Sequence, residues 1–536
     1  MSRAHQAACR CAAALFAGCV AALFASCIAA LFASCVAAAQ APAAKTTAPQ
    51  TAAPVLTVTA RIVVLDVVVT DKAGHLVNSL TKDDFTVYED KTRETIRSFE
   101  GPEQHILPAG VTVNSTADLA KAPDAPITVL VLDELNTRFE DMSFARNSLE
   151  KYLNAQPAVL RQPTALIAAT NTRFQLLQDY TLNRQAVLAA LKNHFPEYPW
   201  RLMQSGKGGP GAAERLAMSL GSLEQIAQAT SGHPGRKNVV WVGRGFPAVN
   251  TQDSADKEAA VIQHAVEHVI DVMRDARITL TTIDPTVNTS TIVDIETPED
   301  LSVAEGETGA DPMAGDVNFQ LLAPATGGRV YLSRNDVDAE IGTSIRDGDN
   351  YYTLSYTPSS QNDAAQPYRR IRIQMGRPGL TATTRNGYYV EPSAPAPNAT
   401  PAGLKQDLAK IAFDLGGAAN STLVYTGLKV TAHRLPAPPN TFAVEVEAKD
   451  LSIPPQGDAQ AEITLMIASF NRQNKMIAHQ IQETTAAIGA TPAQSAEFRI
   501  QAAIPAEAAR VRVIARDTVS GKMGTADLGP SAFRAP

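Results

Sequence analysis

The stretch from Ile127 to Thr137 reads ITVLVLDELNT and decides the fold. It opens with a short, almost continuous apolar run, and a polar loop begins at Asp133. Apolar residues at helical spacing follow from Met142, so the unit predicts a strand, a loop and a helix. A strand that is apolar on both faces belongs in a parallel sheet covered by helices, and such sheets bind ligands at the carboxyl ends of their strands. Asp133 is therefore either a ligand-binding acid or a loop acid that helps to start the next helix.

The same alternation continues through residues 126–390 and predicts an α/β domain with a doubly wound, mostly parallel sheet. Further strand-like runs occupy residues 165–169, 238–242, 278–283 and 329–332. Helical segments are expected at residues 185–195, 212–229 and 255–277. Three later strand-like runs, at residues 351–356, 368–374 and 380–390, have no helices between them, and we expect them to close one edge of this sheet.

The regions before and after this α/β domain differ from it in composition and predict separate segments. We expect a flexible spacer at residues 40–54, a small β unit at 55–125 and a Pro/Ala linker at 391–403. Short strands at regular spacing in residues 404–536 predict a C-terminal antiparallel β-sandwich. With 536 residues the chain is too long for a single core.

The first 39 residues are typical of an export signal. Arg3 and Arg10 precede a long uncharged stretch of Ala, Leu, Phe and Cys that ends in small residues. Cleavage after Ala39 is one outcome, an uncut membrane anchor is a second, and lipidation at Cys35 is a third. We therefore expect an exported protein that is periplasmic, secreted or anchored in the cell envelope, with membrane contact only through this segment.

Charge and cysteine content exclude several classes of function. The net charge is −7, so no basic field attracts nucleic acid, and we expect no nucleic-acid partner. All five cysteines precede residue 36. The remainder of the chain therefore contains no disulfide, zinc–cysteine site or cysteine nucleophile.

Several motifs in a fixed order resemble the von Willebrand factor type A-related domain of exported acidobacterial proteins. The stretches that carry this resemblance are VVTDKAG at Val68–Gly74, LTKDDF at Leu80–Phe85, YED at Tyr88–Asp90, DELNT at Asp133–Thr137, GHPGRKN at Gly232–Asn238, TGG at Thr326–Gly328, YYTLSYTP at Tyr351–Pro358 and RNGY at Arg385–Tyr388. The resemblance implies an exported domain related to adhesion and complex-assembly modules.

Type A domains generally hold Mg²⁺ through Asp-x-Ser-x-Ser, a later Thr and a later Asp, and the resemblance places Asp133 and Thr137 at such metal positions. Leu135 replaces the first Ser, which leaves Asn136 as the nearest oxygen. Arg244 stands where a second acid is expected, so it opposes a cation or pairs with Asp133 in its place. We expect a degenerate site without tight Mg²⁺ binding and no other cofactor.

Asp284 ends another strand and should lie on the same carboxyl edge as Asp133. We therefore predict a ligand-binding set of Asp133, Asn136, Thr137, Arg244 and Asp284. Between Ile278 and Gly328 there are nine acids and no Lys or Arg, so either the partner presents a basic surface or these acids are merely solvated.

One enzyme-like motif remains, the H-x-x-E-H run of His264, Glu267 and His268, which occurs in zinc peptidases. Its helical phase places both histidines opposite the apolar stripe, so solvated surface histidines are the favoured interpretation. We conclude that the chain is an exported, non-enzymatic protein-binding module. The alternatives are a cell-envelope structural protein and a hydrolase built on these three residues.

Overall fold

The computed structural model describes residues 62–170, 174–199, 212–245, 256–285, 322–332, 335–359, 368–390, 401–452, 460–487 and 495–534. They belong to one compact unit, Ala60–Pro536. The predicted leader and spacer, the acids of the 278–328 segment after Asp284 and the first ten residues of the predicted linker lie outside the described residues. Among the helices of the described part, none combines the length and apolar character needed to cross a bilayer.

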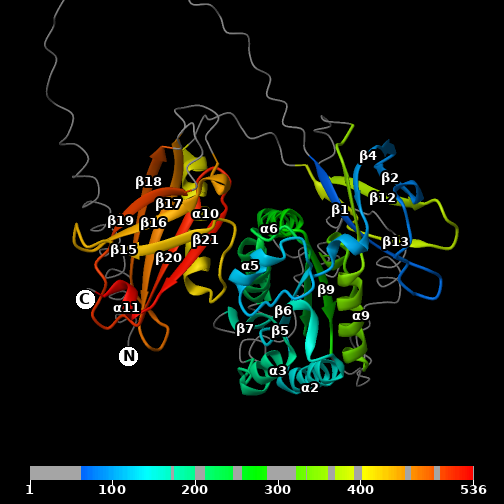
Figure 1. The fold of residues 1–536 in the computed structure, drawn as a ribbon, viewed down its shortest axis with the longest axis horizontal. Helices are drawn as coiled ribbons and strands as arrows, with labels where there is room; N and C mark the ends of the chain where they lie inside the picture. The colour runs from blue at the N-terminus through cyan, green and yellow to red at the C-terminus, as the bar shows by residue number, and fades with distance from the viewer. Residues whose placement is uncertain are drawn as a thin grey trace, which may run out of the picture. The chain divides into compact units, whose positions relative to one another are not determined.

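A six-stranded mixed sheet forms the centre of the α/β region (Figure 1). Its order is β10-β9-β8-β5-β6-β7, and every neighbouring pair is parallel except β6 and β7. The strands are β5 Ile127–Asp133, β6 Val159–Ala169, β7 Phe174–Asn183, β8 Lys237–Val242, β9 Ile278–Ile283 and β10 Val330–Tyr331. The edge strand β7 is absent from the predicted elements. The strand order reverses direction between β5 and β8, which is where sheets of this kind place a ligand crevice.

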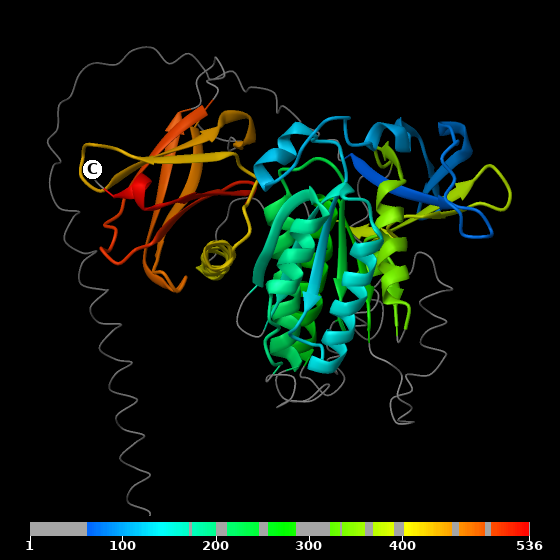
Figure 2. The same cartoon turned by 60° about the horizontal axis from the view of Figure 1, so that its bottom comes forward.

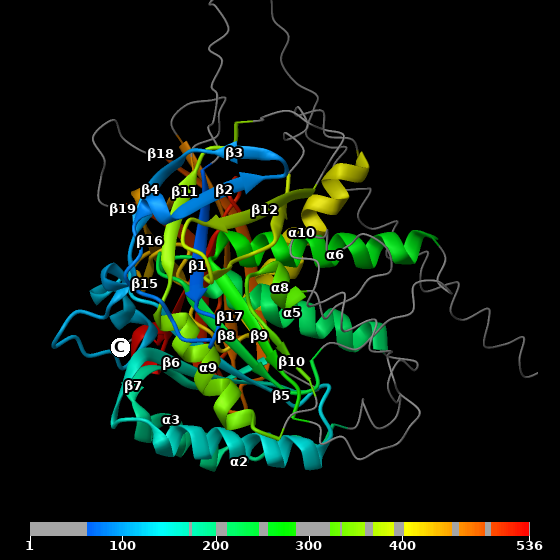
Figure 3. The ribbon, with the colours of Figure 1, turned by 90° about the vertical axis from the view of Figure 1, so that its right-hand side faces the viewer.

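Helices cover both faces of this sheet (Figures 2 and 3). The helices of the region are α2 Phe139–Ala155, α3 Arg184–Asn193, α5 Ala212–Thr230, α6 Asp256–Asp275, α8 Leu322–Ala325 and α9 Val337–Asp349. One apolar cluster joins Val129 and Trp241 to the buried stripes of α5 and α6. A second cluster joins Leu130 and Val240 to α2, α3 and α9 on the other face. Alternate residues of β5 and β8 therefore enter opposite cores, which explains their continuous apolar sequence.

The expected closure of the central sheet by residues 351–390 is wrong. These residues form β11 Tyr352–Tyr356, β12 Tyr368–Met375, β13 Thr381–Thr383 and β14 Gly387–Tyr389. They pair with β1 Val63–Thr70, β2 Phe85–Glu89, β3 Thr92–Glu94 and β4 Ile96–Glu100, giving the sheets β13-β1-β11-β4 and β14-β12-β2-β3. The chain thus enters and leaves the α/β region through one composite β unit, because β1 and β2 find antiparallel partners nearly 300 residues later.

Short 3-10 helices, η1 Lys82–Asp84, η2 Pro102–His105 and η3 Thr116–Lys121, connect these strands to one another and to β5. At η1 the Thr81 amide donates to the Asp84 carboxylate at 2.8 Å, which is part of a capping box at the start of this helix.

The C-terminal part begins with a helix that was not predicted, α10 Pro401–Asn420, which starts inside the expected linker. Two antiparallel sheets follow, β15-β16-β19 and β18-β17-β20-β21, and they share one apolar core. Their strands are β15 Val430–Arg434, β16 Thr441–Glu447, β17 Gln460–Phe470, β18 Met476–Ala487, β19 Ser495–Gln501, β20 Arg510–Asp517 and β21 Met523–Leu528; the short helices η5 Ala448–Asp450 and α11 Pro530–Phe533 complete this part. Apolar side chains of α10, β17 and β20 also join the cluster under α5, so this part packs directly on the α/β region.

Candidate functional site

Asp133 is the last residue of β5, at the carboxyl edge beside the point where the strand order reverses. Its Oδ1 accepts hydrogen bonds from the backbone amides of Leu135 (3.2 Å) and Asn136 (3.0 Å). The carboxylate therefore folds its own loop back, as Asp side chains often do in turns. Asn136 donates through Nδ2 to the hydroxyl of Ser219 on α5 at 2.9 Å, which ties the loop to the helix beneath it.

Asp133 is completely buried, and burial raises its pKa to about 6 against the opposing effect of the Trp241 indole and the loop amides. The guanidinium whose charge acts on Asp133 belongs to Arg215 of α5, which is only 1% exposed. The predicted pairing of Arg244 with Asp133 is not found among the described residues. A buried residue of a helix supplies this charge instead, because α5 packs directly beneath the loop.

The loop after β8 closes over Asp133. The amide of Arg244 donates to the hydroxyl of Thr137 at 2.9 Å. A Cβ added at Gly243 would lie 2.3 Å from the Asp133 Cβ and 2.6 Å from the Thr137 Oγ1. Only a glycine allows such a close approach of backbone to these two side chains.

The other two predicted site residues form a separate outer group. Arg244 and Asp284 are half-buried, and both act on Asp141 in the first turn of α2. Burial raises the pKa of Asp141, Asp284 raises it further, and Arg138 and Arg244 oppose the rise. The structure thus brings Asp133, Asn136 and Thr137 together and places Asp284 with the Arg244 side chain around Asp141.

The inner group, which consists of Asp133, Asn136 and Thr137, does not fit a divalent cation. Asp133 Oδ2 and Asn136 Oδ1 are buried without a hydrogen-bond donor, which a cation would relieve. However, Thr137 Oγ1 already accepts an amide, Leu135 contributes no oxygen, and the Arg215 charge lies close by. A hydrated Mg²⁺ also needs space that the Gly243 backbone takes. Within the described residues, no three or more His, Cys, Asp or Glu side chains are grouped so as to hold a metal.

A neighbouring buried pair was not predicted from the sequence. Glu134 accepts from the His194 ring at 2.6 Å between Oε1 and Nε2, and its Oε2 accepts the amide of Glu197 at 3.0 Å. Arg146 of α2 donates to the His194 carbonyl at 2.8 Å. These bonds fix the segment after α3 against the carboxyl end of β5. The sequence offered one indication of this pair, because Glu134 is a second acid in the DELNT loop. Its partner His194 lies 60 residues away, so the sequence did not reveal the pairing.

Exposed aromatic side chains occur in the two segments that adjoin this buried loop. Phe139, the first residue of α2, is 42% exposed. Phe195 and Tyr198, in the segment that Glu134 fixes, are 85% and 58% exposed. Large aromatic residues exposed beside one loop are candidates for contact with a partner.

The three residues of the peptidase-like motif lie on α6. His264 is exposed and its Nδ1 lies 3.4 Å from the Glu267 Oε2. His268 is more covered than expected, because its Nε2 lies 3.2 Å from the Glu224 Oε1 on α5. The two imidazoles thus face different acids rather than one shared centre.

The comparisons with known proteins add little to this geometry. No protein-family model and no curated protein matches the chain. Among solved structures, the crystal structure of the SpRpn10 VWA domain matches with a TM-score of 0.17 and 13% identity, over 30% of this chain and 89% of that one. An endonuclease/exonuclease/phosphatase from Beutenbergia cavernae matches with a TM-score of 0.11 and 12% identity, over 52% and 61% of the two chains.

Proposed function

We propose that the protein is an exported, non-enzymatic module for adhesion or complex assembly. Its doubly wound, type A-like domain binds a protein partner at the carboxyl edge of the central sheet. The observation that carries this proposal is the exposure of three aromatic residues, Phe139, Phe195 and Tyr198, in the segments that adjoin the Asp133–Thr137 loop. Exposed aromatic side chains supply much of the binding energy at protein interfaces.

Binding at this edge does not require a bridging metal. In a metal-dependent adhesion site the cation is open to the partner's carboxylate. Here Asp133 is buried beneath the Gly243 backbone, and Arg215 contributes positive charge from below. The loop therefore acts as a rigid support for the surrounding contact residues.

The partner presents a basic surface at the rim of this contact. Glu140 is exposed beside Asp141 and Asp284 at the same edge. The acids between Asp294 and Asp316 follow Asp284 in the sequence, and the region from Ile278 to Gly328 contains no Lys or Arg. Complementary charge of this kind mainly accelerates association. Export follows from the leader at residues 1–39 and places the partner outside the cytoplasm.

The test is a pull-down from envelope extracts with residues 40–536 as bait, compared with a Phe195→Ser bait. We expect one defined partner that is retained by the parent bait and reduced at least about tenfold with the variant, because an anchoring aromatic is lost. Ile106→Ser is the matched control, since Ile106 is 68% exposed but lies beside the composite β unit. Equal loss with both variants, or no defined partner, would contradict the proposal and favour a purely structural envelope protein.

Titration calorimetry with Mg²⁺ tests the metal-free part of the proposal. We expect no micromolar binding isotherm. A one-to-one isotherm that Asp133→Ala abolishes would restore a metal-bridged adhesion site. A hydrolase built on His264, Glu267 and His268 is the alternative from another class, and the separate partners of the two histidines give it no support.

A further inference from the structure

The amino edge of the central sheet holds a cluster of buried charges where it meets the composite β unit. Arg277, just before β9, donates from Nη2 to the Asp66 Oδ1 at 2.5 Å, and Asp66 also accepts from the Thr353 hydroxyl at 3.1 Å. Lys237, at the start of β8, is 1% exposed and donates to the His233 carbonyl. The predicted GHPGRKN motif therefore lies at this junction, on the edge opposite Asp133.

Arg236, the residue before β8, differs from the other cations of the cluster. It is only 2% exposed, yet it forms no ion pair with any described residue. Its guanidinium carbon lies 5.0 Å from the Tyr351 ring centre, and its Nε and Nη1 have no hydrogen-bond acceptor. Leaving two buried N–H donors of a guanidinium unsatisfied is costly, so an acceptor is expected beside them.

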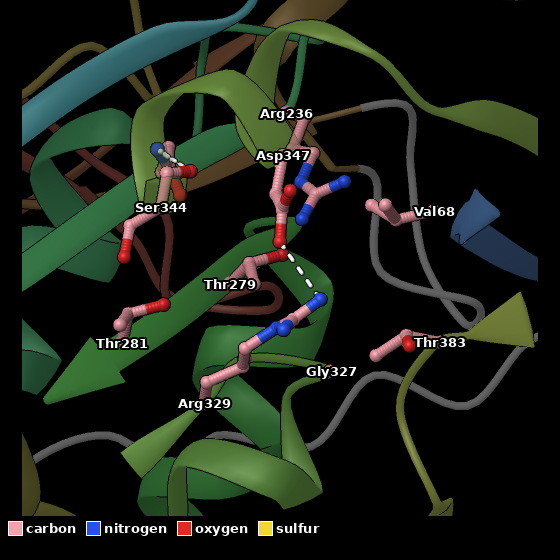
Figure 4. A pocket seen from close by; sticks show the side chains of 11 residues that line it. Val68, Arg236, Thr279, Thr281, Gly327, Arg329, Ser344, Asp347 and Thr383 are labelled. Atoms are coloured by element: carbon pink, nitrogen blue, oxygen red, sulfur yellow. Dashed lines mark hydrogen bonds and ion pairs between the residues drawn. The ribbon is translucent and has the colours of Figure 1, made fainter. Parts of the chain in front are cut away.

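A small polar pocket lies at this position (Figure 4). Its walls come from both sides of the junction: Val68 and Thr383 from β1 and β13, and Arg236, Asn238 and Thr279 from the central sheet and the turn before it. Asp347 and Ser344 of α9 close it together with the Gly327–Arg329 turn. The space holds about one water-sized particle.

The charges around the pocket do not balance. Arg329 pairs with Asp347 at 3.1 Å, and Arg277 pairs with Asp66. Asp347 lies between the Arg329 and Arg236 guanidinium groups in Figure 4, but within the described part of the chain its ion pair is with Arg329. Among the residues that line the pocket, the guanidinium groups of Arg236 and Arg329 therefore face a single carboxylate, that of Asp347.

We propose that this pocket binds a single chloride ion, which accepts the free N–H groups of Arg236 and bridges the composite β unit to the amino edge of the central sheet. A monatomic anion matches the size of the space, whereas phosphate or a carboxylate ligand is too large. One negative charge balances the excess guanidinium. The ion acts as a structural link between β1 and β13 on one side and the start of β8 and β9 on the other.

The test is thermal unfolding of the chain from residue 40 in sodium chloride, with sodium gluconate keeping the ionic strength constant. A bound anion stabilises only the folded state, so we expect a saturable rise in Tm of roughly 2 to 4 °C with chloride. Arg236→Met should abolish the rise. Arg372→Met is the matched control, because Arg372 is exposed on β12, where it stacks over Tyr88, and its loss should leave the chloride effect intact.

Line broadening of ³⁵Cl in nuclear magnetic resonance provides a readout that needs no variant. We expect broadening by the parent protein that bromide reverses by competition. Equal Tm values in chloride and gluconate, together with no broadening, would overturn the proposal and assign the pocket to a water molecule. Retention of the full chloride effect in a folded Arg236→Met variant would overturn it as well, because the anion would then bind elsewhere.

Discussion

At the amino edge of the central sheet, Asp66 of β1 meets Arg277 and Thr353 from distant parts of the chain. At the carboxyl edge, Asp133 is completely buried, whereas the Asp66 side chain is 11% exposed. The Asp133 carboxylate is held by the amides of its own loop and by the Trp241 indole. The pKa of Asp66 is lowered: burial raises it, but Arg277 and Arg236 together more than offset that rise. The pKa of Asp133 is raised to about 6, because burial outweighs its partners.

The two edges therefore affect folding in opposite ways: the buried charges of the amino edge stabilise the folded state, whereas the buried Asp133 carboxylate of the carboxyl edge destabilises it. Charges at the amino edge join the composite β unit to the α/β region, so they contribute to stability. Asp133 reduces stability at neutral pH, which is common at functional positions and unusual elsewhere. The exposed aromatic residues lie at the same carboxyl edge, in agreement with that division.

The largest expected effect comes from breaking the amino edge with Arg277→Met. Removing Arg277 takes away the main partner of the mostly buried Asp66 carboxylate and should cost about 3 kcal/mol in the free energy of unfolding. Urea denaturation measures this loss, with Arg372→Met as an exposed control that should cost less than about 1 kcal/mol. Equal losses in the two variants would show that the junction does not depend on this pair.

The parent protein should also lose stability in acid through Asp66. A carboxyl group with a lowered pKa contributes stability above its unfolded value near 4, and this contribution is lost as the pH falls through the folded pKa. We expect the acid loss to be smaller in Arg277→Met, because the largest of the interactions that lower the pKa of Asp66 is gone.

A smaller effect of opposite sign is expected at the carboxyl edge from Asp133→Asn. The pKa of Asp133 is raised, so the folded state binds the extra proton between about pH 4 and 6, and stability falls as the pH rises through that window. The neutral amide should therefore stabilise the protein at pH 7 by up to about 3 kcal/mol and flatten that part of the profile. Denaturation at pH 4 and pH 7 measures both, with the exposed Asp83→Asn as control. Destabilisation at pH 7 would show that Arg215 compensates the charge fully.

The smallest effect concerns the rate of partner binding. The acids at 296, 299 and 300 lie outside the described residues, and the sequence places them after the carboxyl end of β9. Neutralising all three should slow association several-fold at low salt and leave the folded state intact. Surface plasmon resonance with the recovered partner measures this rate. The test variant carries Glu296→Gln, Glu299→Gln and Asp300→Asn. The control variant has the same change in net charge at exposed acids elsewhere, and it carries Glu103→Gln, Glu462→Gln and Glu507→Gln. Equal on-rates for the parent and the first variant would leave these acids as solubility residues.

The sequence alone determined the parallel strands of the central sheet, although not its antiparallel edge strand β7. Ile127–Leu132 is apolar at every position except Thr128 because both faces of β5 are covered, and periodicity reports burial along a single segment. The phase of α6 placed Val266, Val269 and Met273 inside for the same reason. Asp133 was found from its position after such a strand, and Asn136 and Thr137 were found from the resemblance of the same loop to the metal motif of type A domains.

Only the tertiary structure decided which distant segments meet. Apolar periodicity does not name a partner strand, so β11 was assigned to the central sheet although it pairs with β1. The charge beside Asp133 comes from Arg215 rather than Arg244, because the packing of α5 under the loop, and not distance along the chain, selects it. The buried bond of Glu134 to His194 and the unpaired guanidinium of Arg236 likewise depend on which surfaces enclose them. The energy of a buried charge depends on the groups that surround it in the folded protein. These groups come from distant parts of the chain, so no single stretch of the sequence identifies them.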